Sequence, residues 1–341
     1  MPEPRFLVVR LGSLGDIIHT FPAVSALRES FPRGGIIWLT HPRWEFLVES
    51  SGLATEVWTV ETRAFPSLRQ AIQRLRQAPW TAAIDYQGLW KSAMLPFFGG
   101  VKRRIGFSSA TIREFGVPLL YTERVNTSKT HIAEQNGELS LHAGAQQIIA
   151  PVSLEIPQQD QAAVCARLRA QGLDRYVVLS PGGGWRSKCW PAERFAALCQ
   201  KLRDSLGLRC VVNAGPDDDD VAAELLSASG NAAPFVFRGN LGELMALLRG
   251  AACIVSGDTG PLHLAVALGT PAVALFGPTD PARNGPYSGD VTPPGSQKSL
   301  VMRASGVRTT HARGSQPHPS MLALSVDQVF EATCRCVRGS K

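Results

Sequence analysis

Four stretches in the second half of the chain combine glycines with residues that can bind a phosphate or a ribose. The first, residues 256–263, follows an apolar run, and its glycines allow a backbone to approach a ligand closely. The amides of Thr259 and Gly260 would then open a helix, where the positive end of the helix dipole favours a phosphate. An ordinary strand–helix connection has a similar composition, so this stretch alone leaves both interpretations open.

The other three stretches also follow apolar runs. Residues 180–191 form a glycine-rich loop with Lys188, without the Gly-Lys-Ser/Thr order of a Walker A loop or the spacing of a dinucleotide fingerprint. Residues 215–220 include four aspartates, which either bind ribose hydroxyls or begin a solvated helix. Residues 276–281 form a sharp turn. Four such loops at one edge of a sheet predict a site for a nucleotide diphosphate.

The first half carries a candidate base and several cations. Asp16 ends a glycine-containing loop after the apolar run 6–9, where an acid is either a helix cap or a catalytic carboxylate. Residues 86–91 follow another apolar run, and we expect both loops at the same sheet edge. Cations between residues 102 and 113 either bind an anionic acceptor or form a solvated surface.

The elements that must position these loops alternate between strand-like and helix-like patterns. In the first half, we expect strands at residues 6–9, 36–39, 56–60 and 82–85 and helices at 17–27, 43–50, 68–75, 89–97 and 131–145. In the second half, we expect strands at 176–180, 209–214, 235–237, 253–256 and 272–276 and helices at 193–206, 217–226, 241–248, 262–268 and 322–337. This rhythm predicts an α/β protein with parallel sheets covered by helices on both faces.

The chain of 341 residues is long enough for two domains. We expect domains at residues 1–150 and 162–321, a linker at 151–161 that is rich in proline and polar residues, and a C-terminal helix at 322–341. From residue 285 to 320 the composition shifts to Gly, Pro, Ser, Thr and His, which predicts a long surface segment without regular structure.

Composition narrows the class of protein. The chain has 44% hydrophobic and 18% charged residues, with neither a signal-peptide core nor an apolar run long enough for a membrane span, so we expect a cytoplasmic protein. Its net charge of +7 suits an anionic ligand or a negatively charged membrane surface, and no nucleic-acid motif accompanies that charge. The seven cysteines lack metal-site spacing and are expected to be reduced.

Together, residues 12–16, 84–92, 258–263 and 276–280 resemble the ADP-heptose:lipopolysaccharide heptosyltransferase family (glycosyltransferase family 9), and its type I members above all. These motifs stand in the same order as in the family, and the resemblance covers nearly the whole chain. It implies a GT-B fold, in which two facing Rossmann-like domains bind the acceptor and the nucleotide sugar, respectively. It also implies inverting, metal-independent transfer of L-glycero-D-manno-heptose from ADP-heptose to a Kdo residue of a lipid A precursor, without a cofactor, by a peripheral protein on the cytoplasmic face of the inner membrane.

The resemblance also implies roles for individual residues. Asp16 would be the catalytic base, and Asp218 the contact to the ribose. The other donor-binding residues would be Lys188, Asp258, Thr259, Gly260 and His263, and the acceptor-binding residues Lys91, Arg113 and Arg63. The chain departs from the family at Gly137, near which a further histidine is frequent, and over residues 285–320.

Three alternatives remain open at the level of sequence. A member of the same family, for example of type II, would use another sugar acceptor. A nucleotide-sugar epimerase or hydrolase on the same fold would consume the donor without an acceptor. A non-catalytic nucleotide-binding protein would bind ADP and tolerate the loss of Asp16.

Overall fold

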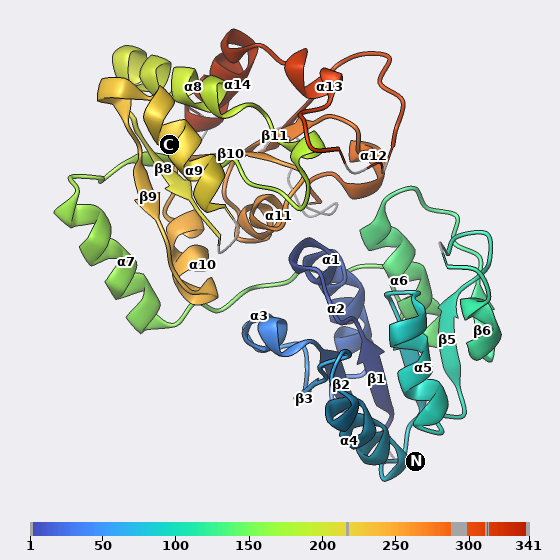
Figure 1. Ribbon diagram of the computed structural model, residues 1–341. Helices are drawn as coiled ribbons and strands as arrows, with labels where there is room; N and C mark the ends of the chain where they lie inside the picture. Colours follow the sequence, from blue (N-terminus) through green and yellow to red (C-terminus); the bar gives the residue numbers. More distant parts are fainter. Residues whose placement is uncertain are drawn as a thin grey trace. The chain divides into compact units, whose positions relative to one another are not determined.

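The computed structural model describes residues 3–112, 114–215, 218–287, 299–310, 312 and 314–338. The chain divides into two compact units, Met1–Glu155 and Ile156–Lys341. In Figure 1 the first unit runs from blue to green and the second from green to red. Each unit consists of a parallel sheet and the helices that connect its strands, which confirms the predicted α/β class.

The first unit has a six-stranded sheet in the order β3-β2-β1-β4-β5-β6. Its strands are β1 (Arg5–Val9), β2 (Gly35–Thr40), β3 (Glu56–Thr59), β4 (Ala82–Asp85), β5 (Arg104–Phe107) and β6 (Glu123–Val125). Its helices are α1 (Leu14–Ile18), α2 (Phe21–Ser30), η1 (Pro42–Trp44), α3 (Glu45–Glu49), α4 (Phe65–Arg76), α5 (Trp90–Phe98), η2 (Val117–Leu120) and α6 (Ile132–Ala143).

The second unit has a six-stranded sheet in the order β12-β11-β10-β7-β8-β9. Its strands are β7 (Tyr176–Ser180), β8 (Arg209–Asn213), β9 (Phe235–Phe237), β10 (Cys253–Gly257), β11 (Ala272–Phe276) and β12 (Ser299–Arg303). Its helices are α7 (Gln158–Ala170), η3 (Arg186–Lys188), α8 (Ala192–Leu206), α9 (Asp219–Ala228), η4 (Gly230–Ala232), α10 (Leu241–Arg249), α11 (Gly260–Ala267), α12 (Pro281–Asn284), α13 (Pro319–Leu322) and α14 (Val326–Arg338).

Both sheets have the Rossmann strand order, in which the first strand lies in the middle. The middle strands β1 and β7 are almost entirely buried because helices cover both faces, and this is why they appear in the sequence as continuous apolar runs. The strand order reverses beside β1 and β7. Ligands of such sheets bind at that reversal, beyond the carboxyl ends of the strands.

The segment from residue 285 to 320 is more regular than its composition predicts. Strand β12 extends the second sheet parallel to β11, and helix α13 begins at Pro319. Leu300 and Met302 pack against the core while Val301 is exposed, which is the alternation of a short edge strand. The prediction of a segment without regular structure is therefore wrong for these residues, while residues 288–298, 311 and 313 lie outside the described ranges.

Three further predictions differ from the observed elements. The helix expected over residues 17–27 is two helices, α1 and α2, and the helix expected over 322–337 is interrupted between α13 and α14. Strand β5 lies where the pattern predicts only a cluster of cations, and β6 lies in a stretch for which no element is predicted. Ile105 and Phe107 of β5 are buried, but the basic residues around them hide this alternation in the sequence.

All seven cysteines are free. Five of them are buried, while Cys165 is exposed and Cys334 lies at intermediate depth. The expectation of reduced thiols is consistent with this arrangement. Burial raises the pKa of the Cys189 thiol, which keeps it protonated near the glycine-rich loop.

Candidate active site

The four loops predicted to bind a nucleotide follow β7, β8, β10 and β11. These strands are parallel neighbours, so their carboxyl ends meet at one edge of the second sheet. The expected convergence of the four stretches is therefore present in the structure. Pro216 and Asp217 of the aspartate stretch lie outside the described residues.

A buried charge network lies at this edge, where β10 ends. Lys188 Nζ lies 2.7 Å from Asp258 Oδ2, and His263 Nε2 lies 3.3 Å from Asp258 Oδ1. The three side chains are only 13%, 9% and 5% exposed, respectively. Burial by itself would raise the pKa of Asp258, but the hydrogen bond from His263 and the charge of Lys188 outweigh it and hold that pKa well below its usual range.

The charge network has a structural cause. Lys188 ends the short helix η3 after β7, whereas Asp258 follows β10, and the adjacency of these strands brings residues 70 positions apart into contact. The Lys188 ammonium also lies 4.3 Å from the centroid of the Trp185 ring, a cation–π contact that fixes the side chain from a second direction. The ammonium is thus held in place before any ligand arrives.

The helix that follows β10 can hold a phosphate. Thr259 is the N-cap of α11 with extended backbone, so the amides at the start of α11 have no partners within the helix. The Ser256 and Thr259 hydroxyls lie 2.9 Å apart, which orients the Thr259 side chain. A Cβ added to Gly183 would lie 3.7 Å from Thr259 Cγ2, so the glycine-rich loop runs directly beside the helix start. Backbone amides, a helix dipole and Lys188 therefore lie close together at this edge, a combination that favours a phosphate.

Asp218 lies against the glycine-rich loop. Its Oδ2 accepts a hydrogen bond of 2.9 Å from the amide of Gly215, and a Cβ added to Gly182 would come within 2.0 Å of its Oδ1. The neighbouring Asp219 instead forms an exposed ion pair with Arg238. The structure thus separates the roles of these aspartates, because Asp218 faces the loop and Asp219 faces solvent.

The C-terminal part of the chain supports the turn after β11. The Thr310 amide donates to the Pro278 carbonyl at 2.8 Å, and Arg303 Nε donates to the Gly277 carbonyl at 3.3 Å. Asp280 caps α12 by accepting from the Ala282 amide at 3.0 Å. The carboxylate of Asp280 is therefore engaged in shaping the turn.

In the first unit, Asp16 lies at the carboxyl edge of the sheet, in helix α1. Its Oδ1 lies 2.8 Å from Arg10 Nη2, and its Oδ2 accepts from the Ser13 amide at 3.1 Å and the Ser13 hydroxyl at 2.9 Å. Its side chain is nevertheless 46% exposed, so a substrate hydroxyl can reach it. Asp16 is thus both a helix cap and an accessible carboxylate, so the two interpretations of the sequence are compatible.

Arg10 is the partner that the sequence pattern did not reveal. It is buried, and its other guanidinium nitrogen donates to the Tyr86 carbonyl. The Gln87 side chain in turn accepts from the Leu11 amide at 2.7 Å. Arg10 therefore ties Asp16 to the loop after β4. The only signal in the sequence is its position directly after a buried strand.

Asp85 organises the loop after β4 from within. It is fully buried and accepts hydrogen bonds from the Gln87 and Gly88 amides and from the Ser92 and Tyr121 hydroxyls, at 2.7–3.2 Å. Burial raises the pKa of Asp85 above its usual value, although these four hydrogen bonds act in the opposite direction. Asp85 is thus a structural support for the loop that leads to Lys91.

The three residues assigned to the acceptor differ in their placement. Lys91 is exposed in the first turn of α5, after the strand that neighbours β1, and so lies at the same sheet edge as Asp16. Arg63 is exposed before α4, after the edge strand β3. Arg113 lies outside the described residues. The structure therefore brings Asp16 and Lys91 to neighbouring strands and leaves Arg63 farther along the sheet.

The structure explains two other features of the first unit, the cations at residues 103–104 and the glycine at residue 137. Arg103 forms a two-pronged ion pair with Glu123, and Arg104 donates to backbone carbonyls, so both serve the fold. A Cβ added to Gly137 would lie 2.2 Å from the carbonyl oxygen of Ile148. A side chain at residue 137 is therefore excluded by the packing of α6.

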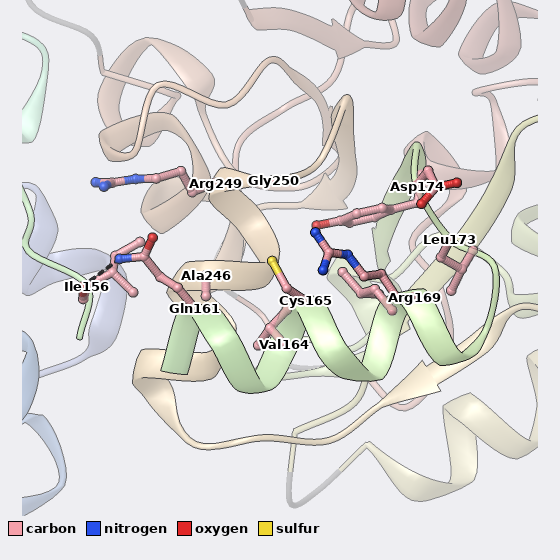
Figure 2. Close-up of a pocket in the computed structure, with 12 residues that line it drawn as sticks. Ile156, Gln161, Val164, Cys165, Arg169, Leu173, Asp174, Ala246, Arg249 and Gly250 are labelled. Carbon is pink, nitrogen blue, oxygen red and sulfur yellow. Dashed lines mark hydrogen bonds between the residues drawn. The ribbon is translucent and has the colours of Figure 1, made fainter. Parts of the chain in front are cut away.

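A pocket in the second unit lies away from these loops. It has a volume of about 370 Å³ and lies between α7 and α10, with Tyr176 and Gly250 at the amino-terminal side of the sheet. Figure 2 shows Cys165 in its middle and Arg249 and Arg169 on opposite sides. Because the nucleotide loops lie at the carboxyl edge, this pocket is not the predicted donor site.

Within the described ranges, no three His, Cys, Asp or Glu side chains are grouped in a way that could hold a metal ion. None of the helices in those ranges combines the length and the apolar composition that a membrane span requires. Lys188 and the start of α11 contribute positive charge at the carboxyl edge of the second sheet.

Two Rossmann-like units, one with glycine-rich loops and Lys188 at the carboxyl edge of its sheet and one with an accessible carboxylate at the corresponding edge, are typical of nucleotide-sugar-dependent glycosyltransferases with a GT-B fold. A family model described as glycosyltransferase family 9 (heptosyltransferase) matches residues 68–302. Lipopolysaccharide heptosyltransferase 1 of Salmonella typhimurium is 30% identical over 300 residues, covering 83% of this chain and 91% of the relative. The chain therefore belongs to glycosyltransferase family 9, and it is a transferase.

Solved structures agree with this assignment. The structure of Escherichia coli ADP-heptose lipopolysaccharide heptosyltransferase II superimposes with a TM-score of 0.80 at 21% identity, covering 98% of each chain. An Escherichia coli heptosyltransferase with ADP gives a TM-score of 0.73 at 25% identity, covering 97% of this chain and 99% of the other. The GT-B fold is thus confirmed.

Proposed function

We propose that this enzyme transfers L-glycero-D-manno-heptose from ADP-heptose to a Kdo residue of a lipid A precursor, in the synthesis of the lipopolysaccharide inner core. The Lys188–Asp258–His263 network beside the start of α11 carries this proposal, because a fixed ammonium group next to free helix amides is suited to a diphosphate. The similarity to lipopolysaccharide heptosyltransferase 1, and to a solved heptosyltransferase with ADP, supports ADP-heptose as the donor.

On the donor side, the second unit would bind ADP and stabilise its departure. Thr259 and Gly260 present amides to a phosphate, and Lys188 contributes the positive charge that the leaving diphosphate needs. His263 acts by holding Asp258, which fixes Lys188. Asp218, which accepts from the Gly215 amide beside the glycine-rich loop, would bind the ribose hydroxyls. Since these groups supply the charge, we propose that transfer does not depend on a metal ion and that turnover survives a chelator.

On the acceptor side, the first unit would supply the base. Asp16 accepts the proton of the attacking hydroxyl, whose oxygen forms a bond to the anomeric carbon. The bond from that carbon to the phosphate oxygen breaks at the same time, and its electron pair leaves with ADP. A single displacement of this kind inverts the anomeric configuration, through a transition state with oxocarbenium character. The reaction requires the two units to bring Asp16 to the bound sugar.

Lys91, Arg63 and Arg113 would bind the anionic acceptor, whose Kdo carboxylates and lipid A phosphates suit cationic side chains. Because such an acceptor is a lipid, we propose that the enzyme works as a peripheral protein on the cytoplasmic face of the inner membrane. The net charge of +7 is suited to an anionic membrane surface.

The experiment is a panel of nucleotide sugars with Kdo–lipid A as acceptor, read by mass spectrometry. We expect a gain of one heptose with ADP-heptose, and no product with Asp16→Asn, which should retain ADP affinity in calorimetry. A product only with an already heptosylated acceptor would indicate a type II reaction. Consumption of ADP-heptose without an acceptor would indicate an epimerase or a hydrolase. Unchanged turnover in Asp16→Asn would overturn the assignment of the base.

A further inference from the structure

The first unit exposes an apolar face that its own fold does not cover. On α5 the exposed side chains of Trp90, Met94, Phe97 and Phe98 follow helical spacing and form one stripe, each between 40% and 44% exposed. The opposite face of the helix is buried. This stripe is therefore not the side on which α5 packs against its sheet.

The loop before η2 extends the stripe. A Cβ added to Gly116 would lie 3.0 Å from Trp90 Cζ2, so this loop rests directly on the first turn of α5. Its Phe115 is 99% exposed and Leu119 is 72% exposed. Large apolar side chains this exposed and this close together are uncommon on a soluble protein and mark a surface for a partner.

Cations border the apolar face. Lys91 and Lys102 are exposed at opposite ends of α5, and Arg76 and Arg124 are exposed on the flanking elements α4 and β6. Glu114 is the acidic neighbour of Phe115, and it accepts from the Trp90 amide at 2.7 Å. The border is thus predominantly basic.

We infer that this face, formed by α5 and residues 115–119, docks on an anionic phospholipid bilayer. Tryptophan and phenylalanine enter the interface between headgroups and acyl chains, while lysine and arginine bind anionic headgroups. A second copy of the chain suits the face less well, because a symmetric contact would bring its basic borders together. The inference rests on the proposed function in one respect: α5 begins directly after the loop 86–89, so docking there would present a lipid acceptor beside Lys91 and Asp16.

The test is sedimentation of the full chain with vesicles. We expect binding to equimolar phosphatidylglycerol and phosphatidylcholine, and much weaker binding to phosphatidylcholine alone, since each basic residue at the surface contributes about fivefold in affinity. The variant Phe115→Ser/Leu119→Ser should bind at least about tenfold more weakly. The matched control Leu226→Ser/Val301→Ser removes two exposed apolar side chains from the second unit and should bind as the wild type does. Met94→Ser is a second probe of the face, and circular dichroism verifies that each variant is folded.

Equal binding of the wild type and Phe115→Ser/Leu119→Ser would overturn the inference, as would the absence of any preference for anionic vesicles. A dimer of the wild type that becomes a monomer in this variant would assign the face to a second copy instead. Turnover with a lipid-free Kdo acceptor separates the two proposals. If Phe115→Ser/Leu119→Ser retains turnover with the lipid-free acceptor and loses vesicle binding, both proposals stand. If the wild type has no turnover with any donor but binds vesicles through this face, the proposed function fails and the docking surface remains.

Discussion

The Lys188–Asp258 ion pair allows a quantitative prediction. At 2.7 Å and an effective dielectric constant of about 20, the attraction between the two charges is about 6 kcal/mol. Removing two mostly buried charges from water costs several kcal/mol, so the net contribution is smaller. We expect Lys188→Met, which retains the apolar stem beside Trp185, to lower the free energy of unfolding by about 3 kcal/mol, because the mostly buried Asp258 carboxylate then loses the ammonium group that pairs with it.

The measurement is a double-mutant cycle with Asp258→Asn, followed by urea unfolding. If the two charges stabilise each other, the double variant should lose no more than about 1 kcal/mol beyond either single variant. Lys201→Met is the matched control, because Lys201 pairs with Asp327 at the surface, and its loss should cost less than about 1 kcal/mol. Additivity of Lys188→Met and Asp258→Asn within about 0.5 kcal/mol would refute the reasoning.

The Lys188–Asp258 pair also predicts how the stabilities of the wild type and Lys188→Met depend on pH. A carboxylate whose pKa is depressed in the folded state stabilises the protein above its unfolded pKa of about 3.9 and loses that contribution as the pH falls toward the folded value. The difference in stability between wild type and Lys188→Met should therefore be full at neutral pH and shrink below about pH 4. In the transfer assay, Lys188→Met should lower kcat by about a hundredfold or more, because the leaving diphosphate loses its preorganised charge.

Two further substitutions test the loops on either side of the reaction. Gly182→Ala should displace Asp218 and weaken ADP binding about tenfold, whereas Gly184→Ala, whose Cβ would have nothing within 4 Å, should leave ADP binding unchanged. Calorimetry with ADP compares the two variants. Equal affinities for ADP would remove Asp218 from the proposed donor site. Asp85→Asn should lower the free energy of unfolding by about 2–3 kcal/mol, because an amide cannot accept all four hydrogen bonds, and an unchanged melting temperature would contradict the role of Asp85 as the support of its loop.

The sequence predicts most of the fold because the central strands are buried on both faces and therefore appear as unbroken apolar runs, as in β7 and β10. It also predicts which loops share an edge, since the carboxyl ends of parallel strands coincide. The strands that the sequence pattern misses lie at or next to one edge of each sheet. Strand β5 lies among cations and β12 is partly exposed along its length, so neither has a strong apolar pattern.

Individual contacts of the site depend on the order of strands, which no local pattern encodes. Lys188 meets Asp258 only because β7 lies beside β10, and Arg10 meets the loop after β4 only because β1 lies beside β4. In the sequence, only its position directly after a buried strand distinguishes Arg10 from a solvated arginine. Its burial and its two partners make it a positioning residue for Asp16.

The hydrogen bonds that Thr310 and His318 donate to the loops after β11 and β7 have a consequence for protein synthesis. The Ser187 carbonyl accepts from the His318 amide at 3.2 Å, and the Pro278 carbonyl accepts from the Thr310 amide, so hydrogen bonds from late in the chain anchor the loops that carry Lys188 and Thr279. The strands that bear these loops leave the ribosome first. The loops after these strands gain all of these hydrogen bonds only after residue 318 has left the ribosome. Until then, the second unit of the nascent chain has a nearly complete sheet whose loops lack these hydrogen bonds.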